Sequence, residues 1–133
     1  MTQQLTMTLP PNVRAAWPVI RERVARMHAA CGEPWLPEDV FNELVNARAF
    51  LWGTEDLEGF LVLQVVPQSY ANELHCWLCY NATTEGVGAY WEQLQAIARE
   101  NECSRITFEN DRKGFERAIP ELRLRYLYSA TVE

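Results

Sequence analysis

The chain has 133 residues, of which 48% are hydrophobic and 23% are charged. This composition supplies enough apolar material for one folded domain over residues 1–133, and it excludes a predominantly disordered chain. The formal net charge of −6 works against nonspecific binding to nucleic acid or to an anionic membrane, so we expect neither as a partner.

The N-terminal segment and the hydropathy of the chain predict where the protein resides. Residues 1–11 lack the basic region and the long apolar core of a signal peptide. No apolar run approaches the roughly 20 residues that a membrane-spanning helix needs. We therefore expect a soluble, cytoplasmic protein.

The first half of the chain predicts a strand, two helices and two strands. Residues 3–9 suit a short edge strand, and Asn12 offers an N-cap for an amphipathic helix that closes near Gly32. Pro37 opens a second helix. Residues 49–52 and 59–66 then read as strands, the second apolar on both faces and hence central in a sheet. The expected buried stripes of the two helices are Val13, Ala16, Trp17, Ile20, Val24, Met27 and Cys31, and Val40, Phe41, Leu44 and Val45.

The second half predicts a strand at residues 74–80 and then a helix that starts at the glycines of the following loop and runs to about Asn101. The expected buried stripe of this helix is Val87, Tyr90, Trp91, Leu94, Ile97 and Ala98. A strand at 105–109, a short helix that ends at Pro120 and a last strand at 124–132 follow. The resulting order is β-α-α-β-β-β-α-β-α-β. It predicts an α/β (α+β) fold with one mixed sheet and helices on both of its faces. The strand-helix-strand unit from 74 to 109 should be a parallel crossover.

The four cysteines lie inside apolar segments, which favours buried free thiols over a disulfide framework. Cys76 and Cys79 form a C-x-x-C that, with His75, could supply zinc ligands. However, residues three apart on a strand point to opposite faces of the sheet. We therefore expect no metal site.

The stretch CYNATTEGVGAYWEQL, residues 79–94, joins an apolar strand to an amphipathic helix through a polar loop with two glycines. Such a corner can hold a phosphate, because glycines allow main-chain N–H groups to converge on an anion and the helix dipole adds a favourable field. The alternative is that the glycines only allow close packing of helix on sheet. Glu85 opposes an anion here, and residues 79–98 contain no Lys or Arg.

The element order and this loop resemble the GNAT superfamily of acetyl-CoA-dependent N-acyltransferases over nearly the whole chain. The family motif is Arg or Gln, two residues, Gly, any residue, and Gly or Ala. Gly86 and Gly88 match it, whereas Thr83 stands at the Arg or Gln position. The resemblance implies acetyl-CoA as co-substrate, with its pyrophosphate on the loop and its pantetheine arm beside the strand end. The implied contacts are Leu78, Cys79, Tyr80, Thr83, Thr84, Glu85, Gly86, Val87, Gly88 and Ala89.

Acyl transfer to an amine needs a base for the amine proton and an acid for the leaving thiolate. Family members often take the acid from a tyrosine in the last helix, but the aligned position here is Ile119. Candidate substitutes for this acid are Tyr80, Tyr126, Tyr128 and Cys79. Candidate bases are Glu109, Asp111 and Glu116. Each also fits a structural role, the strand aromatics in the core and the acidic residues on a solvated face.

Two functions follow from the resemblance. The first is an N-acyltransferase that moves an acetyl group from acetyl-CoA to an amine of a small molecule or a protein. The second is a non-catalytic GNAT-like structural or assembly protein, because residues 112–117 resemble the last helix of small GNAT-like proteins encoded by bacteriophages. That alternative implies a homo-oligomer or phage structural partners, and a place in the virion or the host cytoplasm.

Overall fold

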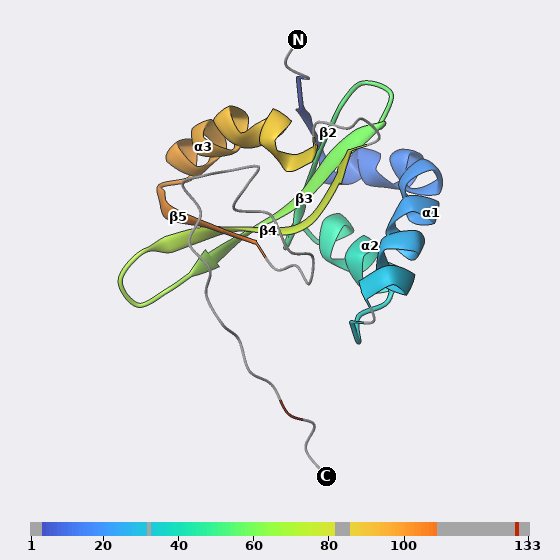
Figure 1. Ribbon diagram of the computed structural model, residues 1–133, viewed down its shortest axis with the longest axis horizontal. Helices are drawn as coiled ribbons and strands as arrows, with labels where there is room; N and C mark the ends of the chain where they lie inside the picture. Colours follow the sequence, from blue (N-terminus) through green and yellow to red (C-terminus); the bar gives the residue numbers. More distant parts are fainter. Residues whose placement is uncertain (1–3, 32, 82–85, 109–129, 131–133) are drawn as a thin grey trace.

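The computed structural model describes residues 4–31, 33–81, 86–108 and 130 (Figure 1). Within these ranges a five-stranded sheet has the order β1-β2-β3-β4-β5. Its strands are β1 (Thr6–Thr8), β2 (Phe50–Gly53), β3 (Gly59–Pro67), β4 (Asn72–Asn81) and β5 (Cys103–Phe108). The first four pair antiparallel, and β4 and β5 pair in parallel. The mixed sheet and the parallel crossover expected from the sequence are thus confirmed.

Helices cover both faces of the sheet, as predicted. Helices α1 (Val13–Cys31) and α2 (Pro37–Val45) lie on one face, and α3 (Trp91–Glu100) lies on the other (Figure 1). The observed order agrees with the predicted one as far as β5. The helix expected before Pro120 and the strand expected at 124–132 lie outside the described residues, apart from Ala130, which is exposed and belongs to no strand. None of the described helices combines the length and apolarity needed to cross a bilayer.

Two apolar cores flank the sheet, and β3 contributes to both by strict alternation. Phe60 and Val62 point toward α1 and α2, whereas Leu61 and Leu63 point toward α3. We call these the α1/α2 core and the α3 core. The predicted helix stripes supply their other walls: Val13, Ile20, Val24, Val40 and Leu44 are buried in the first, and Tyr90, Leu94, Ile97 and Ala98 in the second.

Two predicted helix starts are wrong in detail. Asn12 is the last residue of a 3-10 turn, η1 (Pro10–Asn12), that leads straight into α1, so the helical path begins at the prolines, whose fixed φ suits a first turn. Similarly, α3 begins at Trp91 and not at the glycines. A 3-10 turn, η2 (Gly86–Tyr90), precedes it, in keeping with the poor α-helical propensity of glycine.

Gln93 of α3 holds the segment that leads into β1. The Leu5 N–H donates to Gln93 Oε1 at 3.0 Å, and Gln93 Nε2 donates to the Leu5 carbonyl oxygen at 2.6 Å. Leu5 itself is buried in the α3 core. The Gln93 amide therefore takes the place of a strand partner for Leu5 and ties the edge of the sheet to α3.

Replacing Gln93 with alanine should lower the free energy of unfolding by about 1–3 kcal/mol, because both main-chain groups of Leu5 lose their partner. Urea unfolding measures the change. Gln95→Ala, on the same helix, is the matched control, since Gln95 has no side-chain hydrogen bond within the described part of the chain. Equal losses for the two variants would contradict this role of Gln93.

Candidate active site

Strand β4 contains a β-bulge at Trp77. Its ladder with β3 pairs Leu63 with Cys76 and Val62 with Leu78, so Trp77 is one residue too many for the facing strand. A bulge of this kind interrupts the hydrogen-bond ladder, bends the strand and re-aims the residues that follow. The main chain of β4 therefore changes direction at Trp77.

The bulge overturns the predicted orientation of the C-x-x-C. Trp77 and Leu78 both pack in the α1/α2 core, while Cys76 and Cys79 both pack in the α3 core. The two thiols therefore share a face, where an unbroken strand would have separated them. Cys76 Sγ donates to the Leu78 carbonyl oxygen across the bulge at 3.4 Å. Within the described ranges, no three metal-binding side chains come together.

Just before the bulge, β4 pairs in parallel with β5. Its register runs from Asn72 with Cys103 to Cys76 with Phe108, the last described residue of β5. The pairing of β4 with β3 extends beyond the bulge to Asn81. The bulge turns the segment of β4 from Trp77 onward away from the line of the ladder that β4 forms with β5 between Asn72 and Cys76.

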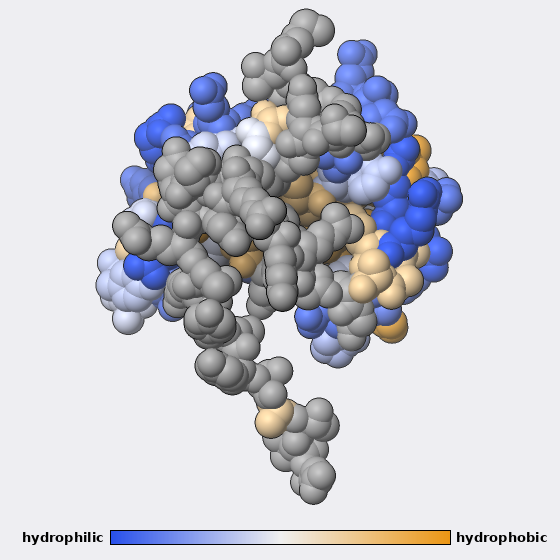
Figure 2. Space-filling view, viewed as in Figure 1, coloured by the Kyte–Doolittle hydropathy of each residue, from blue (hydrophilic) through white to orange (hydrophobic). Residues whose placement is uncertain are grey.

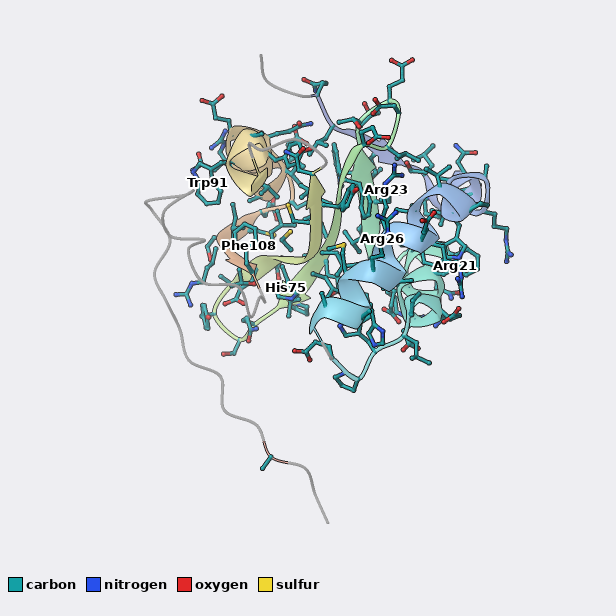
Figure 3. All side chains as sticks on the ribbon, turned by 45° about the vertical axis from the view of Figure 1, so that its right-hand side comes forward. Arg21, Arg23, Arg26, His75, Trp91 and Phe108 are labelled. Atoms are coloured by element: carbon teal, nitrogen blue, oxygen red, sulfur yellow. The ribbon has the colours of Figure 1, made fainter. Side chains whose placement is uncertain are left out.

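Two aromatic side chains flank this point on the α3 face. Trp91, the first residue of α3, and Phe108, at the end of β5, both pack against the α3 core and lie on one side of the sheet (Figure 3). The Trp91 Nε1 atom is buried and has no hydrogen-bond acceptor among the described residues. Leaving such a donor unpaired costs about 1–3 kcal/mol, so this indole N–H is an unused donor for a bound ligand.

On the opposite face, the bulge residue is packed against the connection between α1 and α2. Trp35 meets Trp77 edge to face with ring centroids 5.6 Å apart, and His28 lies 5.0 Å from Trp35. His75 Nδ1 lies 2.8 Å from Thr107 Oγ1 and so links β4 to β5 just before the bulge. The contact with Trp35 holds the side chain of Trp77 from the α1/α2 side.

The structure brings together part of the predicted site. Leu78, Cys79 and Tyr80 follow the bulge directly. The stretch Gly86, Val87, Gly88 and Ala89 lies in η2, immediately before α3, and Ala89 packs against the α3 core. The Tyr80 ring stacks on Phe60 at 5.3 Å, which places it on the α1/α2 side. Thr83, Thr84, Glu85, Glu109, Asp111, Glu116, Tyr126 and Tyr128 lie outside the described residues.

Two surface hollows lie elsewhere. One, of about 440 Å³, borders β1 and the turn after β2, with Met7, Gly53 and Leu57 in its lining. The other, of about 190 Å³, lies between the sheet and the end of α3, with Trp52, Val65 and Ile97 in its lining. Neither hollow is lined by residues of β4 beyond the bulge. The candidate site is therefore identified from the geometry of β4 and not from the size of a cavity.

The fold is shared with solved acetyltransferases. The chain is 14% identical to a probable acetyltransferase, with a TM-score of 0.72 over 98% of each chain. It is 10% identical to an aminoglycoside acetyltransferase from an uncultured soil metagenomic sample in complex with sisomicin, with a TM-score of 0.71 over 99% of this chain and 97% of that one. It is 15% identical to ribosomal-protein-alanine N-acetyltransferase from Brucella melitensis biovar Abortus, with a TM-score of 0.60 over 97% and 96%.

No family model matches the sequence, and neither does any curated protein. The relationship is therefore one of fold, at identities too low for sequence comparison to carry function. The α/β fold is shared with solved acetyltransferases, and the resemblance expected from the element order is confirmed at the level of the fold.

Burial raises the pKa of the Cys76 thiol well above its usual value, and the neighbouring Cys79 adds to this shift. The neutral thiol therefore stabilises the folded state below the pKa of an unfolded cysteine, about 8.5, and this contribution is lost as the pH rises above it. The loss can reach about 1.4 kcal/mol per pH unit for a single group.

Between pH 8 and pH 10, the free energy of unfolding should thus fall less in Cys76→Ala than in the unaltered protein. Urea unfolding at a series of pH values measures both slopes, and circular dichroism at pH 7 confirms that the variant is folded. Parallel curves would contradict the burial of Cys76 at the bulge.

Proposed function

We propose that the protein is a single-domain N-acyltransferase that transfers an acetyl group from acetyl-CoA to an amine. One observation carries the proposal: a bulge at Trp77 bends β4, which pairs in parallel with β5 just before it, in a fold shared with acetyltransferases. The bend would turn β4 beyond Trp77 away from the line of β5 and leave it beside a cleft in which an extended ligand can lie.

The pantetheine arm of coenzyme A suits such a place, because it is extended and contains two amide groups. An extended ligand of this kind can hydrogen-bond to a strand as another strand would. The proposed main-chain partners are Leu78, Cys79 and Tyr80, which directly follow the bulge. The buried Trp91 Nε1 would supply one more donor to a ligand oxygen at the α3 side of the cleft.

The pyrophosphate would lie on the loop from Thr83 to Ala89. Gly86 and Gly88 carry no side chain that could keep a phosphate from the main chain. The start of α3 at Trp91 follows directly, and its dipole favours an anion on that side. The charge of Glu85 opposes this arrangement, and a cation from elsewhere in the chain would offset it.

In the proposed reaction, the amine nitrogen attacks the thioester carbonyl carbon, and the carbon–sulfur bond then breaks. Coenzyme A leaves as a thiolate that takes up a proton, and the amine gives one up. Main-chain N–H groups at the bulge are suited to stabilise the oxyanion that forms between the two steps. Tyr80, Tyr126 and Glu109 remain the proposed acid and base candidates.

The acceptor is proposed to be a cationic amine of a small molecule or a protein N-terminus. The structurally similar proteins include an aminoglycoside acetyltransferase and a ribosomal-protein-alanine N-acetyltransferase. The net charge of −6 favours the approach of a cationic acceptor.

The non-catalytic assembly role stays a prediction, motivated by the absence of the motif Arg or Gln at Thr83 and of the tyrosine at Ile119. It predicts no release of the coenzyme A thiol when acetyl-CoA is mixed with aminoglycosides or with an alanine peptide. Turnover with any of these amines would exclude it.

Deleting Trp77 provides a sharp test, because it should remove the bulge yet leave Cys76 and Leu78 opposite their present partners. We expect the deletion to weaken acetyl-CoA binding at least tenfold in calorimetric titration. Trp77→Ala loses the same side chain but keeps the extra residue, so it should bind much more tightly than the deletion variant. Circular dichroism would confirm that both variants fold.

Equal affinities of the two folded variants for acetyl-CoA would show that the bulge does not form the site. No detectable heat from the folded, unaltered protein at millimolar acetyl-CoA would overturn the proposed function itself.

A further inference from the structure

We infer that Arg23 of α1 is the cation that faces the phosphates of coenzyme A, in place of an arginine within the loop. The inference rests on the proposed function. Its starting point is a deficit of charge, because residues 79–98 contain no Lys or Arg while Glu85 adds a negative charge. A phosphate held there needs a positive charge from another element.

Arg23 lies against the end of β4 that leads into this loop. Its guanidinium carbon is 5.4 Å from the centroid of the Tyr80 ring, and Tyr80 is the penultimate residue of β4. The loop follows within two residues along the chain. Among the arginines of α1, Arg23 thus contacts the strand that the proposed pantetheine site uses.

The burial of Arg23 distinguishes it from its neighbours. Its side chain is 17% exposed, compared with 53% for Arg21 and 67% for Arg26. Figure 3 shows Arg23 directed toward the sheet and Arg21 on the outer side of α1. The outer surface of α1 is hydrophilic, as a solvated helix face should be (Figure 2).

The guanidinium of Arg23 is held in place before any ligand arrives. Nη1 donates to the Val19 carbonyl oxygen at 3.3 Å, and Nη2 donates to Glu58 Oε1 at 3.0 Å. The stack of Phe60 and Tyr80 supports it from the sheet. A guanidinium has five N–H donors, and these two hydrogen bonds use only two of them. The remaining N–H groups can bind a phosphate, because the planar guanidinium matches the geometry of phosphate oxygens.

The acids beside Arg23 compete for its charge. Glu58 pairs with it directly, and Asp56 lies in the same turn between β2 and β3. The pKa of Asp56 is lowered, first by the hydrogen bond from the Glu58 N–H, then by that from the Thr54 hydroxyl, and in smaller part by the charge of Arg23. Removing the charge of Glu58 should therefore make Arg23 a stronger partner for a phosphate.

The test measures coenzyme A affinity by calorimetry in four variants. Arg23→Met keeps most of the aliphatic length and loses the charge, so coenzyme A should bind about 10- to 100-fold more weakly, as expected for a charge-assisted hydrogen bond. Arg23→Lys should keep much of the affinity, and Glu58→Gln should increase it. Arg26→Met, an exposed arginine of the same helix that pairs with Glu22, should leave the affinity unchanged.

Two results would overturn the inference while the proposed function stands. In the first, Arg23→Met binds coenzyme A as tightly as Arg26→Met does. In the second, Arg23→Lys loses as much affinity for coenzyme A as Arg23→Met, which would show that Arg23 acts through packing and not through its charge. Circular dichroism identifies any unfolded variant, and Glu58→Gln, at an exposed position, then carries the test through its predicted gain. An unaltered protein that does not bind coenzyme A would overturn both proposals.

Discussion

The extra residue at Trp77 is the constraint on which the candidate site depends. It lets β4 stay paired with β3 on both sides of the interruption while the strand changes direction. The preceding residue, Cys76, pairs with Phe108 of the parallel strand β5. The bulge also costs regular ladder bonds, so it must be stabilised by its surroundings, and the contact of Trp35 with Trp77 is one such support.

The remainder of the fold holds this strand rigidly. Strand β3 is buried from both sides by two separate cores, so β4 has a fixed partner along its whole length. On the α3 side, the Gln93 amide joins the helix to Leu5, so the start of α3 is fixed relative to the sheet. A site made of main-chain groups needs this support, since its geometry cannot be corrected by side-chain rotation.

The sequence predicted the elements well because each helix stripe and each central strand carries a clear period. The bulge could not be predicted from the sequence, because β4 is apolar on both faces and Trp77 and Leu78 are both apolar. In such a strand, an extra residue does not change the pattern of apolar and polar side chains. The same extra residue explains why the two cysteines were assigned to opposite faces. The contact of Arg23 with Tyr80 joins two elements that are distant in the sequence, so a local sequence pattern cannot predict it. Trp91 fits the predicted helix stripe, and only the packing shows that its N–H has no acceptor within the described part of the chain.

The central claim, that β4 beyond Trp77 and the start of α3 form one acetyl-CoA site, is tested most directly by nuclear magnetic resonance of the ¹⁵N-labelled protein during titration with acetyl-CoA. We predict that the main-chain amide signals of Leu78 and Tyr80 and the indole N–H signal of Trp91 shift together and saturate at one ligand concentration. Saturable shifts confined to other residues, with these three signals unmoved, would contradict the account.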